Sequence, residues 1–498
     1  MSDSLNKRFA IKLLANIVTV IINAVIVAVV PTALGPISYG NFNYLQQFFN
    51  QLIAFVDLGT SSCFFTKLSA DNDRRELLKI YALFSISLFS VLFLLVLLAK
   101  ELGYAEFLLS DIPDSYIFYG FWFGFLTWFT QIYVKISDAY ALTVSVEAIK
   151  IIHKSLMLGV LLYFINYLPF DLYLYYYFHY LSLATFVIVI SLVFHNENIF
   201  NIDVFIRKVG YKKVLNEFYQ FCSPLLLFNI VAIGVGIIDI WLLQTVSGSI
   251  QTGFYGLAYS IAAMCCVFTS AMTPIITREF SKSFAKNDLL EMRRLFLQYV
   301  PILYALAAYF SIFIVFEVDN LLSVFTDERF KGAHIALLII AFYPLHQTYG
   351  QINAALFFAT DETRKYRNIG LISSLIGVIF SYLFIYQLEF GAAGFAFKMV
   401  LTQLIAVNIQ LFFNVRKLKL NFFHFINHQI YTVVIFVMMA YFSSLIVDFE
   451  NILVNIFVGG FLYSVLIVCC LCVFPSVVGV SKQQLFSCLL KIIKIKKF

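Results

Sequence analysis

The chain has 498 residues, of which 61% are hydrophobic and only 12% are charged, and its mean hydropathy is +0.89. Soluble domains carry about a quarter of their residues as charged side chains, so this composition excludes a soluble enzyme, a disordered scaffold and a secreted disulfide-rich protein. The net charge of +6 is too small to indicate a nucleic-acid partner. The eight cysteines lack metal-site spacing and no P-loop is present, so we expect neither a metal nor a cofactor.

Long apolar segments run through the whole chain. A membrane-crossing helix needs about 20 mostly apolar residues, and the sequence offers fourteen such segments. We therefore predict an all-α, polytopic membrane protein with fourteen transmembrane helices. They are expected at residues 11–30, 41–65, 78–99, 115–135, 149–167, 172–194, 222–246, 253–277, 296–316, 333–358, 368–387, 391–413, 430–447 and 452–474.

The basic residues are sorted between alternate connections of these helices. Nearly all of the 34 Lys and Arg residues fall at the two termini or in every second connection. The alternate connections hold only Lys100, Arg329 and Lys331, and Lys398 lies inside a predicted helix. Because cytoplasmic loops are rich in Lys and Arg, we expect both termini in the cytoplasm. The longest external connections, near 100–114 and 317–332, are too short for a catalytic domain, which argues against an enzyme.

A weak internal repeat relates the two halves of the chain. A constant offset aligns Asn16 with Asn229, Gly35 with Gly248, and Gly40 with Gly253. Six predicted helices separate the two copies, so both copies share one orientation, as in parallel repeats related by an axis along the membrane normal. We predict two six-helix lobes, residues 1–210 and 211–415, followed by two further helices and a basic cytoplasmic tail in 416–498.

Two short motifs lie at the first pair of predicted helices. Residues 33–42 read ALGPISYGNF, and residues 55–59 read FVDLG. The second half adds Pro224, Gly253-Phe254-Tyr255 and Pro274 at the ends of its first two helices. Together these features resemble the bacterial flippases of polysaccharide units (O-antigen or capsule repeat units), which belong to the multidrug/oligosaccharidyl-lipid/polysaccharide (MOP) exporter superfamily.

The resemblance implies a MATE-like fold and a transport function in the cytoplasmic (inner) membrane. A member of this family would flip an undecaprenyl-diphosphate-linked oligosaccharide from the inner to the outer leaflet, for polysaccharide biosynthesis such as that of lipopolysaccharide O-antigen. Its partners would be this lipid-linked substrate, membrane lipids and polysaccharide assembly proteins. Two alternatives stay open: an ion-coupled drug exporter of the same superfamily, and a membrane oligosaccharide polymerase or ligase.

Five polar residues in the predicted helices are candidates for substrate binding. A charge at the bilayer centre costs about 2.5–3.5 kcal/mol on insertion scales, so Lys398 should face a partner or a hydrated cavity, where it would contact a diphosphate or sugar. Lys12, Asn16 and Asn23 share one helical stripe, although Lys12 alternatively extends to the membrane interface and the two Asn side chains alternatively bond neighbouring helices. Gln347 lies in the most polar mid-membrane segment, 343–353.

Three titratable residues are candidates for ion coupling. Asp239 lies at a predicted depth similar to that of Lys398, and the two alternatively form a structural ion pair. His346 follows Pro344, which can kink the helix, and imidazole titrates near neutral pH; the alternative is a packed, satisfied side chain. Asp57 lies within the second predicted helix, where the alternative is a packing role.

Overall fold

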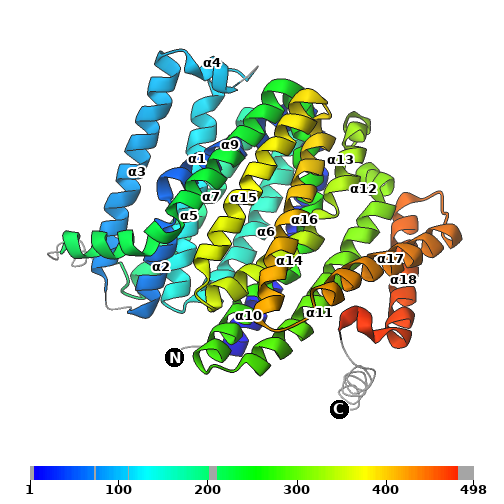
Figure 1. Cartoon of the computed structure of the whole chain (residues 1–498). Coiled ribbons are helices and arrows are strands. Elements are labelled where there is room, and N and C mark those ends of the chain that lie inside the picture. Colours follow the sequence, from blue (N-terminus) through cyan, green and yellow to red (C-terminus); the bar gives the residue numbers. More distant parts are fainter. Residues whose placement is uncertain (1–4, 72–73, 110–111, 201–209, 480–498) are drawn as a thin grey trace. The chain divides into compact units, whose positions relative to one another are not determined.

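The computed structural model describes the whole chain except residues 1–4, 72–73, 110–111, 201–209 and 480–498 (Figure 1). The described residues form helices and connections, which confirms the predicted all-helical, multi-pass membrane fold. The helices of the first half are α1 (Leu5–Asp57), α2 (Thr60–Ala70), α3 (Glu76–Glu101), α4 (Tyr104–Leu109), α5 (Tyr116–Ala139), α6 (Thr143–Tyr167) and α7 (Leu172–Asn196).

The helices of the second half follow in chain order. They are α9 (Tyr211–Ala263), η1 (Met264–Cys266), α10 (Val267–Ala285), α11 (Leu289–Phe316), α12 (Val318–Phe325), η2 (Glu328–Ala333), α13 (His334–Ile340), α14 (Tyr343–Ala359), α15 (Thr363–Ser381), the π-helix η3 (Tyr382–Gln387), α16 (Gly391–Lys417), α17 (Phe422–Ile446), α18 (Ile452–Val473) and η4 (Pro475–Val478).

The predicted transmembrane segments fall largely on helical residues, but the segment predicted at 41–65 is broken at Leu58 and Gly59, where α1 ends and α2 begins. By length and apolar composition, ten helical segments of the described chain are long enough to cross a membrane. Two of them, Leu14–Asp57 and Leu226–Ala285, each overlap two of the predicted helices. Helix α5 and the successive helices α13 and α14 cover the remaining two predicted positions.

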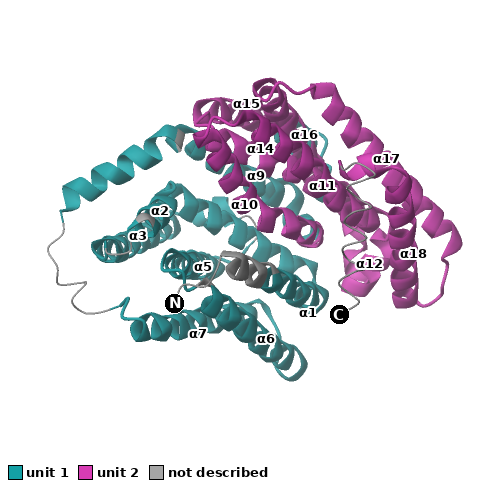
Figure 2. Cartoon of the chain, turned by 90° about the horizontal axis from the view of Figure 1, so that it is seen from below, with its two compact units in different colours: residues 1–256, 381–392 teal, residues 257–380, 393–498 magenta. Residues whose placement is uncertain are grey.

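Contacts between residues divide the chain into two compact units, coloured separately in Figure 2. Unit 1 comprises Met1–Gly256 and Ser381–Ala392, and unit 2 comprises Leu257–Phe380 and Ala393–Phe498. The two lobes predicted at 1–210 and 211–415, and the segment 416–498 after them, are defined by the repeat rather than by contacts, and their boundaries remain a prediction.

Helices α1 and α9 are each 53 residues long, and each is broken at a single glycine. Gly35 has φ 75° and ψ 165°, and Gly248 has φ 80° and ψ 174°, a backbone region that is essentially restricted to glycine. The repeat aligns these two glycines, so its two copies contain the same break. The connection expected at 31–40 is therefore wrong in extent: the helix continues through Pro31 and Pro36 and is interrupted only at Gly35.

Just beyond the two breaks, α1 and α9 approach each other within unit 1 without room for side chains. A Cβ added to Gly40 would lie 1.8 Å from the Ser249 carbonyl oxygen, and one added to Gly253 would lie 2.4 Å from the Pro36 carbonyl oxygen. The offset that aligns Gly40 with Gly253 also aligns Pro36 with Ser249. Such reciprocal contacts between equivalent residues are typical of a two-fold axis, so the two copies of the repeat meet here.

The short helix α4 is attached to both of these long helices. The Tyr44 hydroxyl of α1 donates a hydrogen bond to the Leu108 carbonyl, and the Trp241 indole of α9 donates one to the Phe107 carbonyl at 3.1 Å. The last carbonyls of a helix lack partners within the helix, so both bonds satisfy groups that would otherwise be unpaired. They fix α4 against the region where α1 and α9 cross.

At its other end, unit 1 is closed by an apolar core and an ion pair. Phe64 of α2, Tyr81 of α3, Ile136 of α5 and Phe194 of α7 are buried together there. The Arg74 guanidinium donates to the Glu217 carboxylate at 2.9 Å, which holds the pKa of that carboxyl below its usual range. This contact fixes the first turns of α9 to the connection before α3.

Unit 2 is built around α11, which packs against α10, α14 and α17. Its core includes Phe296, Tyr304, Tyr349 and Phe425, all almost completely buried. The last two helices belong to this unit: α17 packs on α11, and the Tyr309 hydroxyl of α11 lies 2.6 Å from the Ser464 hydroxyl of α18. The helices predicted to stand outside the repeat therefore pack against one helix of its second copy.

The close approach of α1 and α9 predicts that a side chain at Gly40 lowers the stability of the protein. Gly40→Ala should destabilise the protein by more than the about 1–3 kcal/mol typical of an overpacked core, because the obstructing atom belongs to the backbone and cannot rotate away. Gly234→Ala in the same α9 is the matched control, since a Cβ there meets nothing within 4 Å. The measurement is the thermal unfolding of each variant purified in detergent; equal unfolding temperatures for the two variants would contradict the crossing.

Candidate functional site

A buried carboxylate lies at a break between two helices of unit 1. Leu58 (φ 45°) and Gly59 (φ 87°) end α1 and allow α2 to begin in a new direction. Asp57, 7% exposed, accepts hydrogen bonds from the Ser61 backbone N–H at 3.1 Å, the Ser61 hydroxyl at 2.8 Å and the Thr60 hydroxyl at 2.8 Å. The carboxylate therefore binds the first turn of α2, where backbone N–H groups lack helical partners.

Two further side chains from other helices complete this polar centre, which we call the Asp57 network. The Tyr81 hydroxyl of α3 donates to Asp57 at 3.1 Å. The Lys135 ammonium of α5 donates to the Ser61 hydroxyl at 2.7 Å, and through that hydroxyl it is linked to the carboxylate. The carboxylate, the ammonium and three hydroxyl groups therefore form one connected polar network inside unit 1.

Lys135 is the last residue of the transmembrane helix predicted at 115–135. Helix α5 instead continues to Ala139, so Lys135 lies a full turn inside the helix and partly buried. The sequence contained a signal for this network in Asp57-Leu58-Gly59-Thr60-Ser61, where a carboxylate, a helix-breaking glycine and two hydroxyl residues follow one another. Its partners on α3 and α5 depend on tertiary packing.

Asp239 forms a second buried polar centre in unit 1. It lies in α9, is 4% exposed, and accepts a hydrogen bond of 2.5 Å from the Ser381 hydroxyl. Ser381 is the last residue of α15, and the π-helix η3 begins immediately after it. Short π-helical segments are rare and occur frequently at functional sites, so this carboxylate lies beside an unusual backbone segment.

Lys398 is buried in α16 of unit 2, with 5% of its surface exposed. Its side chain packs against Gly377 of α15, which has no side chain. A Cβ on that glycine would lie 3.4 Å from Lys398 Cε. The ammonium also lies 5.6 Å from the centre of the Phe395 ring, one turn earlier in the same helix. The contact of Lys398 with a diphosphate or sugar and its pairing with Asp239 both remain predictions.

The polar segment 343–353 begins a helix rather than kinking one. Helix α13 ends at Ile340, α14 starts at Tyr343, and Pro344 occupies the first turn of α14, where a missing N–H costs nothing. Gln347 accepts hydrogen bonds from Gln403 of α16 at 2.7 Å and from the Tyr343 hydroxyl at 3.3 Å. This residue is half-buried and already partnered within unit 2.

Other polar side chains of α14 bond to neighbouring helices. The hydroxyls of Thr348 and Thr269 are 3.0 Å apart, and Asn414 donates to the Asn353 carboxamide oxygen at 2.9 Å. Two buried polar atoms of this helix, His346 Nδ1 and the Tyr349 hydroxyl, have no hydrogen-bond partner among the described residues. The ion-coupling role expected for His346 remains a prediction.

The candidates on α1 are distributed along its first half. Asn16 is partly buried and Asn23 is exposed, while the hydroxyl of Thr19 between them is buried without a partner among the described residues. The side chain of Lys12 lies outside the part of the chain that the structure describes. The roles expected for Lys12, Asn16 and Asn23 remain predictions.

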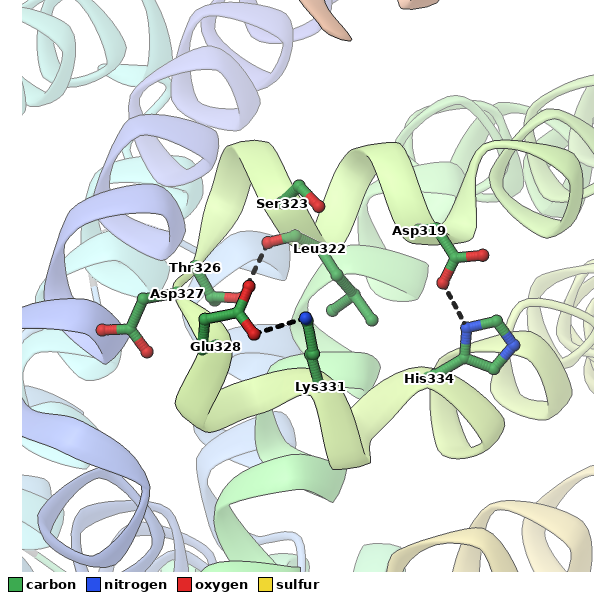
Figure 3. Close-up of a pocket in the computed structure, with 8 residues that line it drawn as sticks. All are labelled: Asp319, Leu322, Ser323, Thr326, Asp327, Glu328, Lys331 and His334. Carbon is green, nitrogen blue, oxygen red and sulfur yellow. Dashed lines mark hydrogen bonds and ion pairs between the residues drawn. The ribbon is translucent and has the colours of Figure 1, made fainter.

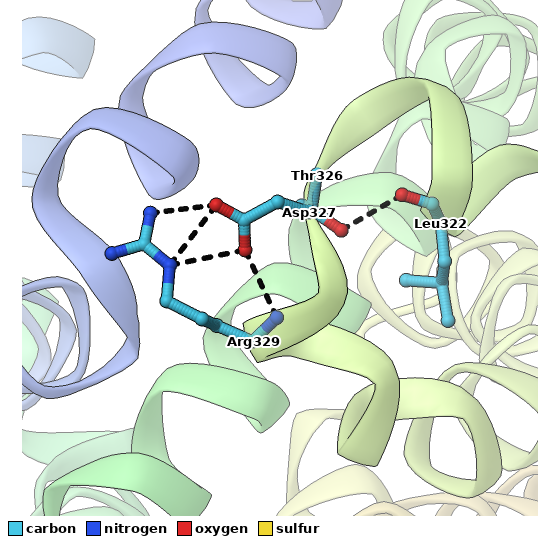
Figure 4. A network of polar contacts seen from close by, with 4 residues as sticks. All are labelled: Leu322, Thr326, Asp327 and Arg329. Atoms are coloured by element: carbon cyan, nitrogen blue, oxygen red, sulfur yellow. Dashed lines mark hydrogen bonds and ion pairs between the residues drawn. The ribbon is translucent and has the colours of Figure 1, made fainter.

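A polar cavity of about 600 Å³ lies in unit 2 between α12 and α13 (Figure 3). Its polar side chains already bond to one another: the Asp319 carboxylate lies 2.6 Å from His334 Nδ1, and Glu328 pairs with Lys331. At its edge Arg329 donates to Asp327 at 2.6 Å and lowers the pKa of that carboxyl (Figure 4). In the described part of the chain, no group of three His, Cys, Asp or Glu side chains is placed to hold a metal ion.

Comparisons with known proteins identify the fold. No protein-family model and no curated protein matches the sequence. An inward-facing multidrug resistance MATE transporter of the MOP superfamily matches with a TM-score of 0.64 and 14% identity, over 84% of this chain and 96% of that one. The lipid II flippase MurJ, in an inward closed conformation, matches with a TM-score of 0.64 and 14% identity, over 93% and 98%. An outward-facing MATE transporter matches with a TM-score of 0.57 and 16% identity, over 83% and 94%. The chain therefore has a MATE/MurJ-like fold.

The Asp57 network predicts a specific pattern of stabilities. Asp57→Asn removes the charge that faces Lys135 and should destabilise the protein by on the order of 3 kcal/mol, because a buried charge is left without its counter-charge. The double variant Asp57→Asn/Lys135→Met should recover part of this loss, since no charge then remains. Thermal unfolding in detergent measures both; a double variant less stable than Asp57→Asn would contradict the linkage.

Proposed function

We propose that this protein is a flippase that moves a polyprenyl-diphosphate-linked oligosaccharide from the inner to the outer leaflet of the cytoplasmic membrane by alternating access. Both termini lie in the cytoplasm, and the substrate serves the synthesis of a surface polysaccharide such as O-antigen or capsule. No bond of the substrate is made or broken, so the protein is a transporter and not an enzyme.

One observation favours a lipid flippase over a multidrug exporter with the same fold. The lipid II flippase matches 93% of the chain, whereas the inward- and outward-facing MATE transporters match 84% and 83% of it. The motifs in residues 33–42 and 55–59, which resemble polysaccharide-unit flippases, point to the same class. A lipid-linked substrate accounts for both.

The buried charges suit such a substrate. A diphosphate and its sugars need polar surroundings inside the membrane, because an unpaired charge in hydrocarbon is costly. Lys398 supplies a buried positive charge in unit 2, and Gln347 with Gln403 supplies amide groups of the kind that bind sugar hydroxyls. Asp239 and His346 are the proposed ion-coupling groups, together with Asp57.

The crossing of α1 and α9 is the proposed closed gate on the external side. Gly40 and Gly253 follow the first and seventh predicted helices at the ends opposite to the basic connections. Backbones in direct contact leave no path for a sugar headgroup between these two segments, so outward opening requires α1 and α9 to separate. The higher TM-score with the inward-facing MATE transporter than with the outward-facing one is consistent with this arrangement.

The decisive experiment follows the leaflet in which the lipid-linked sugar resides. Proteoliposomes containing the purified protein and a fluorescent polyprenyl-diphosphate oligosaccharide are treated with a membrane-impermeant quencher. The protein should increase the quenched fraction over protein-free vesicles, since flipping brings labelled headgroups to the accessible leaflet. Lys398→Ala should slow this by about ten-fold or more, because hydrogen bonds to charged groups contribute about 1.5–3 kcal/mol.

The exposed Lys282→Ala in α10 is the matched control, and its rate should equal that of the wild type. A quenched fraction equal to that of protein-free vesicles would reject the flippase. Uptake of a cationic drug under the same conditions, without flipping of the lipid, would instead identify a drug exporter.

A further inference from the structure

Two adjoining cavities lie between α3 and α5 of unit 1, and together we call them the α3–α5 groove. The first, of about 380 Å³, is lined by Ala82, Ser85, Ile86, Phe89, Trp122, Phe125 and Phe129. The second, of about 230 Å³, shares Ala82, Ser85 and Phe129 with the first and continues to Leu78, Tyr81 and Ile136. Their combined size falls within the range of ligand sites, about 300–1,000 Å³.

The groove opens within the apolar surface of a membrane-spanning helix. Positions 82–89 lie in the first half of α3, a 26-residue apolar helix, and Ile86 at the rim is 63% exposed. Apolar side chains exposed at this depth in a membrane protein meet hydrocarbon rather than water. Whatever fills the groove is therefore a hydrocarbon chain.

The lining of the groove differs from the rest of this surface. The large apolar side chains exposed farther along α3, Val91, Leu94, Leu95 and Leu98, are aliphatic. Within the first cavity the lining is instead mostly aromatic: the Phe89 ring lies 5.0 Å from the Trp122 ring and 4.9 Å from the Phe125 ring. These rings hold one another in place, so the cavity is preformed and its walls present ring faces and edges.

The polar atoms near the groove are directed away from it. The Ser85 hydroxyl donates to the Tyr81 carbonyl at 2.8 Å, and the Tyr81 hydroxyl donates to Asp57. The surface offered to an occupant is consequently almost entirely apolar. Near the start of α3, Arg75 and Lys79 carry positive charge; the Arg75 guanidinium also donates to the Asn198 carbonyl, and Glu76 beside it is paired with Arg74.

We propose that the α3–α5 groove binds the polyprenyl chain of the transported lipid, an inference that rests on the function proposed above. Polyprenyl chains carry a double bond and a methyl branch in every unit, and these polarisable groups pack well against aromatic rings, whereas a straight saturated acyl chain is served equally by the aliphatic surface beyond the groove. The basic residues at the start of α3 match the anionic diphosphate at the head of such a chain. The groove thus holds the tail on unit 1 while the headgroup crosses.

Photocrosslinking tests this directly. The purified protein in phospholipid vesicles is exposed to a diazirine-labelled polyprenyl diphosphate or, in parallel, to a diazirine-labelled phospholipid, and the labelled peptides are identified by mass spectrometry. The polyprenyl probe should label α3 and α5 around positions 82–89 and 122–129, and excess unlabelled polyprenyl diphosphate should remove the label.

Ala82 lines both cavities, so Ala82→Phe should fill the groove and reduce this labelling by about ten-fold, which corresponds to about 1.4 kcal/mol of binding free energy. Ser87→Phe, exposed on α3 outside the lining, is the matched control and should label like the wild type. Trp122→Ala serves as a second variant, because this side chain is 41% exposed and its removal leaves the core intact.

The outcomes separate the groove from the proposed function. Polyprenyl labelling that is displaceable but located elsewhere would overturn the groove and leave the flippase standing. Equal labelling of the groove by the phospholipid probe, not displaced by polyprenyl diphosphate, would make it an ordinary lipid contact. Absence of displaceable polyprenyl labelling anywhere on the protein would contradict the proposed function itself.

Discussion

Two helices approach each other only as closely as their side chains allow, and at Gly40 and Gly253 only hydrogen atoms separate the backbones of α1 and α9. The positive-φ breaks at Gly35 and Gly248 turn both helices just before this contact, in the same conformation in each copy of the repeat. Neither the breaks nor the contact tolerates a Cβ atom. Four glycines therefore determine where the two copies of the repeat meet, and α4 is fixed against the same region through Tyr44 and Trp241.

A second constraint comes from the cost of polar groups away from water. Each buried charge in this chain must be accommodated by its surroundings, and the Asp57 network shows how: a helix break supplies backbone N–H groups, and neighbouring helices supply a hydroxyl and an ammonium. Asp57 thus has a structural role, because its hydrogen bonds to Thr60 and Ser61 fix the first turn of α2. Asp239 and Lys398 are accommodated differently. The Ser381 hydroxyl, beside the π-helix, donates a hydrogen bond to Asp239, and Gly377, which has no side chain, leaves room for Lys398.

Much of this fold follows from patterns that a single sequence carries. The apolar segments predicted the helices, and the aligned glycines at 35, 40, 248 and 253 predicted equivalent positions that proved to share conformation and contact. Helix ends were predicted less accurately: the helix predicted to end at Lys135 continues to Ala139. Which side chains meet across helices, such as Tyr81 with Asp57 or Gln403 with Gln347, depends on packing that no local pattern encodes.

In the proposed transport cycle, α1 and α9 must separate at their crossing. A Cβ at Gly256 would lie 2.5 Å from Asn43 Cγ, the position that a sulfur atom at residue 43 would occupy, so Asn43→Cys/Gly256→Cys in a background without the native cysteines tests it most directly. Oxidation to the disulfide should stop lipid flipping in proteoliposomes, and reduction should restore it. Flipping by each single variant should be unaffected by oxidant. Undiminished flipping by the fully oxidised protein would contradict it.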